Sequence, residues 1–129
     1  MRMRSILLTI AAFSASALAC FSERTSGPDQ SAGACTANLP AEAFGSTIVI
    51  IRNFAFSPAQ VTVARGARVT WVNCGAQGDD SHTSTADGNA WRSQLLAPGE
   101  SFTATLNTAG SFGYHCEPHP TMRGTVTVQ

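Results

Sequence analysis

The sequence predicts an all-β fold, a Greek-key β-sandwich of two antiparallel sheets. From Ser46 onward, short β-branched and aromatic runs alternate with turn residues. No helix of ordinary length fits between these runs. Apolar residues within the runs recur at every second position, so each strand presents one apolar face. Two sheets packed face to face bury all of these faces in one interior.

The expected strands follow one another closely along the chain. The first two runs are short and rich in Val, Ile and Thr, and the third places Val69 and Trp71 two positions apart. The last three repeat this alternation, as in Phe112, Tyr114 and Cys116. We therefore expect strands at 47–51, 60–63, 67–72, 101–106, 111–116 and 125–128.

Composition limits the classes of function. The chain has 129 residues, of which 43% are hydrophobic, enough for the core of one domain. Eight basic residues, all arginine, balance eight acidic residues. Such a balance gives no strong field toward nucleic acid, so nucleic-acid binding is not expected.

The N-terminal residues have the pattern of an export signal. Arg2 and Arg4 precede an apolar stretch at 6–13, and the small residues 17–19 suit a cleavage site. We expect a signal peptide at 1–19, a tether rich in small and polar residues at 20–45, and one domain at 46–129. The mature chain would keep six arginines against eight acidic residues, a formal charge of −2.

Cleavage after Ala19 would make Cys20 the first mature residue, the position that carries the lipid in bacterial lipoproteins. Ala17 stands where such signals usually have leucine, so plain secretion is the alternative. Both readings predict a periplasmic or secreted protein, with or without a lipid anchor on Cys20.

A short segment near the C-terminus concentrates metal-binding residue types. Cys116, His119 and Met122 recur at every third position, which in isolation could mark one face of a helix. Pro118 and Pro120 exclude a helix, because each lacks an amide donor. The segment is therefore expected to be a tight loop between two strands, with a thiolate, an imidazole and a thioether around one point.

The fourth expected ligand is His82, which lies 34 residues before Cys116. Two imidazoles, one thiolate and a weak axial thioether are characteristic of a type 1, or blue, copper site. Such a site carries single electrons, and with four protein ligands it has no open position for a substrate. The ligand set thus predicts an electron carrier and not an enzyme. The alternative is a copper carrier or storage protein that delivers the metal.

At these residues the chain resembles the cupredoxin family, and its Cys-x-x-His-x-x-Met spacing is similar to the short ligand loop of amicyanins. The resemblance extends upstream to 54–58, 61–63 and 69–73 and covers about 46–129. It implies redox-protein partners, with a dehydrogenase as donor and a c-type cytochrome as acceptor by family analogy, and a monomer.

Two positions depart from the family pattern. Thr83 follows the first histidine where amicyanin and plastocyanin commonly have Asn, so the side-chain link across the site is expected to differ. The Thr83 amide would still be able to donate to the sulfur. Cys74 matches no family ligand. With Cys116 assigned to copper and Cys20 to the N-terminus, Cys35 and Cys74 are expected to form a disulfide.

Several other residues carry narrower expectations. His115 should point away from the metal, since it alternates with Tyr114 and Cys116 along a strand. Glu117 is either a solvated carboxylate without a role or a negative charge that favours Cu(II). Trp71 is expected in the core rather than in an electron relay. An apolar rim around His119 is expected from the residues Pro118, Pro120 and one of Leu95, Leu96 or Pro98.

Overall fold

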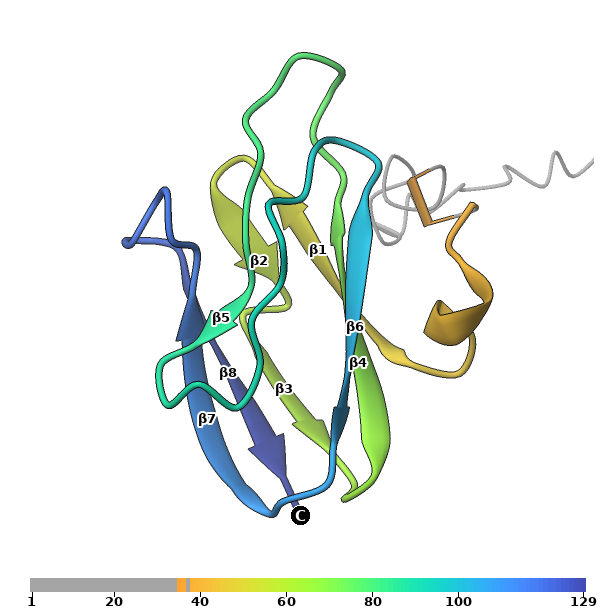
Figure 1. Ribbon diagram of the computed structural model, residues 1–129, viewed down its shortest axis with the longest axis vertical. Coiled ribbons are helices and arrows are strands. Elements are labelled where there is room, and N and C mark those ends of the chain that lie inside the picture. Colours follow the sequence, from red (N-terminus) through yellow and green to blue (C-terminus); the bar gives the residue numbers. More distant parts are fainter. Residues whose placement is uncertain (1–34, 37) are drawn as a thin grey trace, which may run out of the picture.

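The computed structural model describes residues 35, 36 and 38–129, which form a β-sandwich of two four-stranded sheets (Figure 1). The predicted sandwich is confirmed. The first sheet has the order β2-β1-β4-β6, with β1 (Thr47–Arg52), β2 (Ala55–Ser57), β4 (Ala67–Asn73) and β6 (Ser101–Leu106). The second has the order β3-β8-β7-β5, with β3 (Gln60–Val63), β5 (Thr85–Ala86), β7 (Gly110–His115) and β8 (Arg123–Val128).

The sheets are mixed, which corrects the expectation of purely antiparallel sheets. β1 pairs with β4 in parallel, and β3 pairs with β8 in parallel, while the other pairs are antiparallel. Apolar periodicity shows which face of a strand is buried but not the direction of its neighbour. Here β3 crosses to the second sheet before the chain returns as β4, so β1 and β4 become parallel neighbours.

The predicted strands agree with the observed ones to within two residues at each end. Two strands were missed because they are too short for an alternation pattern, β2 with three residues and β5 with two. β2 follows β1 through a tight turn at Asn53 and Phe54, both with positive φ. β5 pairs only with β7. Both short strands lie next to loops that carry the site described below.

Aromatic residues fill the centre of the sandwich. Trp71 and Tyr114 are fully buried, which confirms the expected core role of Trp71. The ring of Trp71 stacks on that of Trp91, with centroids 5.2 Å apart. Burial raises the pKa of Tyr114 to about 12. Gly124 on β8 is required because a side chain there would collide with the Tyr114 ring.

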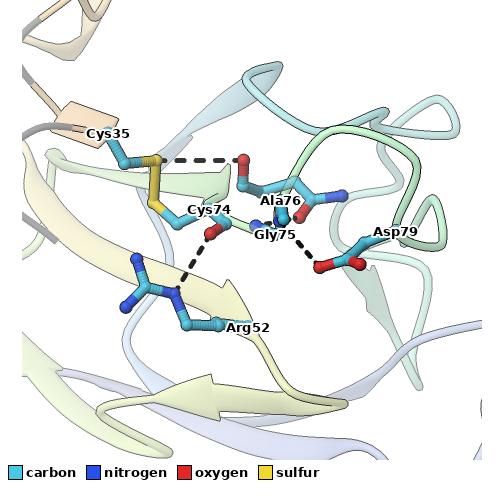
Figure 2. The surroundings of a disulfide bond; sticks show 7 residues. Cys35, Arg52, Cys74, Gly75, Ala76 and Asp79 are labelled. Carbon is cyan, nitrogen blue, oxygen red and sulfur yellow. Dashed lines mark hydrogen bonds between the residues drawn. A yellow bond between two sulfur atoms is a disulfide. The ribbon is translucent and has the colours of Figure 1, made fainter. Parts of the chain in front are cut away.

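Cys35 and Cys74 form the predicted disulfide (Figure 2), with their Cα atoms 5.5 Å apart. Cys74 directly follows β4, so the bridge ties the segment before the sandwich to the start of the β4–β5 loop. A short 3-10 helix, η1 (Ala41–Ala43), lies between the bridge and β1, and its Ala43 is buried. Part of the predicted tether therefore packs on the sandwich.

The expected signal peptide and Cys20 lie outside the described residues. Among the helices of the described part of the chain, none has the length and apolar character needed to cross a membrane.

Candidate metal centre

Three of the predicted ligands converge at one end of the sandwich. His82 lies on the β4–β5 connection, where it exchanges two backbone hydrogen bonds with Leu96. Cys116 directly follows β7, and His119 lies in the loop that leads to β8. The donor atoms of these three residues lie within 4.8 Å of one another. The structure therefore brings three of the four residues proposed from the sequence to one point.

Both histidines present the same ring nitrogen to the cluster. The Sγ atom of Cys116 lies 3.6 Å from Nδ1 of His82 and 3.7 Å from Nδ1 of His119. The two Nδ1 atoms are 3.2 Å apart. The three donors thus enclose a single point, and the Nε2 edge of each ring is directed away from it.

The loop from Cys116 to Met122 is a tight turn, as its two prolines predict. The amide of Met122 donates to the His119 carbonyl at 2.9 Å, and the amide of Cys116 donates to the Met122 carbonyl at 3.2 Å. These hydrogen bonds fold the three residues onto one another. Met122 is only 3% exposed, and it belongs to the same buried cluster as Cys116. The Met122 side chain is thus held in the interior, and its backbone is hydrogen-bonded to that of Cys116.

Thr83 makes the link across the site that the family resemblance left open. Its backbone amide donates to the Cys116 sulfur at 3.3 Å, as expected. Its hydroxyl oxygen accepts a hydrogen bond from the Glu117 amide at 2.9 Å and another from the Thr85 hydroxyl at 3.3 Å. Thr83 therefore joins the β4–β5 connection, which carries His82, to Cys116 and Glu117.

Burial divides the site into an inner and an outer side. Cys116 is fully buried and His82 is 4% exposed, whereas the His119 side chain is 26% exposed. Burial holds the pKa of His82 below its ordinary value, and the charge of a protonated His119 lowers it further, against the opposing effect of Asp80 and Asp79. The low pKa favours the neutral imidazole, the form that binds a metal.

The donor set fits copper. One thiolate and two imidazole nitrogens at a common point, with a buried thioether nearby, match the trigonal ligands and long axial ligand of a type 1 copper site. Structural zinc sites are tetrahedral and fully closed by Cys and His, and catalytic zinc sites keep a position for water. Among the described residues the cluster holds one thiolate and two imidazoles, one Cys or His short of a closed structural zinc site.

Sequence reasoning missed Phe54, which covers the outer side of the site. Its ring meets the His119 ring edge-on with centroids 4.9 Å apart, and the His82 ring in the same way at 5.6 Å. Phe54 is 56% exposed and has a φ of 57°, a conformation that bulky residues rarely adopt. The sequence places Asn53 and Phe54 as a two-residue turn between apolar runs, which could have indicated a hairpin. Such turns usually have glycine at the second position, so Phe54 did not match the pattern.

The expected rim around His119 is partly confirmed. Pro118 and Pro120 are exposed, and Leu95 is 55% exposed. Leu96 is fully buried and so is excluded from the rim. The reason is its backbone pairing with His82, which directs this residue into the core.

Glu117 pairs with Arg92 across 2.7 Å and is not an isolated charge. Neither expectation for Glu117 included this partner, which partly neutralises the charge that was expected to favour Cu(II). His115 points away from the donors, as expected, and its Nδ1 lies 2.6 Å from Asp87. The hydrogen bond to His115, together with nearby Arg123, holds the pKa of Asp87 below its usual value.

Comparison with known proteins agrees with this geometry. Residues 45–129 match the family described as copper binding proteins, plastocyanin/azurin family. The plastocyanin of Scenedesmus fuscus is 43% identical in an alignment of 84 residues that covers 57% of this chain and 86% of that protein. Amicyanin-alpha of Methylorubrum extorquens is 33% identical over 117 residues, 89% of this chain and 95% of that protein.

Solved structures give the same result. A reduced variant of amicyanin superposes with a TM-score of 0.62 at 26% identity, over 73% of this chain and 89% of that one. A purple cupredoxin from Nitrosopumilus maritimus gives 0.59 at 26% identity, over 65% of this chain and all of that one. Plastocyanins and amicyanins are copper proteins that carry electrons and are not enzymes. This chain belongs to the plastocyanin/azurin family of copper-binding proteins.

Proposed function

We propose that the chain binds one type 1 copper ion through His82, Cys116, His119 and Met122 and carries single electrons between redox proteins outside the cytoplasm. The observation that carries this proposal is the convergence of one buried thiolate and two imidazole Nδ1 atoms within 4.8 Å. When bound, copper supplies a one-electron couple, and the residues of the chain determine how readily that couple cycles.

Each ligand has a distinct part in this proposal. Cys116 is the strong sulfur donor, and the Thr83 amide at 3.3 Å moderates the charge on its sulfur. Burial lowers the pKa of His82, which favours the neutral imidazole. Met122 is the weak axial donor, set by the turn that joins its amide to His119. Because both oxidation states share these positions, electron exchange requires little rearrangement.

His119 is the proposed point of electron exchange. It is the most exposed of the three donors, and the exposed residues Phe54, Pro118 and Pro120 surround it. A small, mainly apolar surface suits brief contacts with a partner protein. By family analogy the donor is a dehydrogenase and the acceptor a c-type cytochrome, and the chain acts as a monomer.

Export supports the extracytoplasmic part of the proposal. The bridge between Cys35 and Cys74 is the kind that forms and persists in oxidising compartments. The sequence pattern of residues 1–20 adds an export signal and a cysteine that can carry a lipid. We therefore place the protein in the periplasm or outside the cell, with a lipid on Cys20 as the proposed anchor.

Spectroscopy and voltammetry of the copper-loaded protein test the proposal. We expect one copper per chain, an intense thiolate charge-transfer band in the visible range, and a reversible one-electron wave. Replacing Met122 by Gln should keep the band but shift the potential, because only the axial donor changes. Absence of both the band and the wave would refute the electron-carrier function.

The same sample distinguishes electron transfer from copper delivery. Because the sulfur of Cys116 and the ring of His82 are buried, we expect slow loss of copper to a chelator in excess. Release within seconds would instead favour a carrier or storage protein. Capture of partners from the membranes of the source cells by the copper-loaded protein would then identify donor and acceptor.

A further inference from the structure

We propose that Asp80 is a positioning residue for His119, whose carboxylate fixes the imidazole in its metal-binding tautomer and lowers the reduction potential of the site. The proposal rests on the function proposed above and extends it to a residue outside the ligand set. The Oδ2 atom of Asp80 lies 3.6 Å from Nε2 of His119. This separation is too long for a direct hydrogen bond, so the contact is electrostatic.

The contact involves the ring nitrogen that a metal would leave free. Nδ1 of His119 faces the sulfur of Cys116 and Nδ1 of His82, at 3.7 Å and 3.2 Å. With Nδ1 committed to the metal, the ring proton must lie on Nε2. A carboxylate near Nε2 favours that tautomer, in the way that acceptors near the second nitrogen of metal-binding histidines orient the ring.

The backbone of Asp80 is fixed by the core of the protein. Asn73, which is fully buried at the end of β4, donates from its side-chain amide to the carbonyls of Asp80 at 3.1 Å and Leu96 at 2.9 Å. Leu96 in turn pairs with His82. The buried side-chain amide of Asn73 thus fixes the backbone of Asp80 relative to Leu96, which pairs with His82.

The start of the same loop is held by further contacts (Figure 2). The Cys74 carbonyl accepts from Nε of Arg52 at 3.1 Å, and the Gly75 amide donates to the Asn73 side chain at 3.0 Å. The Asp79 carboxylate accepts from the Ala76 amide at 2.7 Å, which closes a tight turn. Asp79 is therefore part of the loop structure, whereas its neighbour Asp80 is directed to His119.

The two other acidic side chains near the donors are less able to affect the site. Glu117 is paired with Arg92 at 2.7 Å, and Asp79 serves the turn. Among the described residues, the ionic contact of Asp80 is with His119 and not with an arginine. Its negative charge stabilises the oxidised site, which carries one more positive charge, and so lowers the reduction potential.

The test compares Asp80→Asn and Asp80→Glu with Asp79→Asn and Glu42→Gln in the copper-loaded protein. Asp79→Asn removes a charge one residue away, and Glu42→Gln removes one from exposed η1. We expect D80N to raise the midpoint potential above that of the wild type, more strongly at low ionic strength. D80E keeps the negative charge, so its potential should stay close to that of the wild type. A shift equal to a tenfold change in the oxidised-to-reduced ratio is about 59 mV.

A second measurement uses the copper-free protein. Nitrogen chemical shifts of the His119 ring should show the Nε2-protonated tautomer as dominant in the wild type and less populated in D80N, with E42Q like the wild type. This readout does not depend on electron transfer. If the wild type lacked the blue band while the tautomer result held, the proposed function would fail and the Asp80 contact would stand.

Two results would overturn the proposal. The first is an unchanged potential in D80N at low ionic strength, or an unchanged tautomer. The second is an equal rise in D79N and D80N, since that would reflect the total charge of the loop and not the contact with His119.

Discussion

The inner and outer sides of the metal site are built by different interactions. On the inner side, Cys116 and His82 are buried, and Thr83, the neighbour of His82, donates from its amide to the Cys116 sulfur and accepts from the Glu117 amide at its hydroxyl. On the outer side, the partly exposed His119 ring packs edge-on against the Phe54 ring and makes an ionic contact with Asp80. Hydrogen bonds act only at short range and fix the positions of the groups that they join. Exposed charges act over longer distances, and salt weakens their effect. We therefore expect the inner side to govern copper binding and the outer side to govern the potential and the electron exchange.

The strongest way to break the inner side is Cys116→Ser. The change should abolish the blue band, because the thiolate is the source of the charge transfer. The sandwich should remain folded, since serine is close to cysteine in size and the rest of the aromatic core is untouched. Visible absorption and near-UV circular dichroism are the measurements. An equally blue C116S protein would contradict the copper assignment.

The next effect concerns the anchor of the outer loop. Replacing both Cys35 and Cys74 by Ser should lower the free energy of unfolding by about 2–4 kcal/mol, because the bridge closes a long loop in the unfolded chain. The blue band should persist, since neither sulfur is a ligand. Urea unfolding gives the stability. A double variant as stable as the wild type, or one without the band, would show that the bridge is not a separate structural anchor.

A smaller effect is expected from Thr83→Val, which keeps the shape of the inner link but removes its hydroxyl. The Glu117 amide would lose its acceptor, at a cost of about 1 kcal/mol. Copper should also dissociate faster, because the loop of Cys116 is less restrained. Thr83→Ser is the matched control and should behave like the wild type in urea unfolding and in chelator assays. Loss of stability in Thr83→Ser but not in Thr83→Val would point to packing of the methyl group instead.

The smallest effect is expected from Glu117→Gln, which compares a carboxylate paired with an arginine with Asp80, whose contact is with His119. Exposed ion pairs are worth about 0–1 kcal/mol, so the potential should rise by less than about 40 mV. Arg92→Gln should change the potential in the opposite direction, because it leaves the Glu117 charge uncompensated. Voltammetry at two ionic strengths compares the two variants. A rise in E117Q as large as in D80N would mean that Arg92 does not screen Glu117.

Much of this protein was determined by its sequence alone. Period-two apolar positions such as Val69 and Trp71 predicted the strands, because each strand must bury one face. Cys116, His119 and Met122 were predictable as a unit, since three-residue spacing and two prolines leave a tight loop as the local solution. The disulfide followed from the count of cysteines in an exported chain. These features depend on neighbours in the chain or on residue counts.

The tertiary structure alone decided the surroundings of the ligands. The parallel pairing of β1 with β4, the Phe54 ring over the histidines, the Arg92 partner of Glu117 and the approach of Asp80 to His119 all join segments far apart in the chain. No local periodicity encodes such contacts, because they depend on where loops meet after the two sheets have packed. The chain therefore specifies three of its four proposed ligands within one loop, while His82 and the charges and rings around the site are brought to that loop only by the fold.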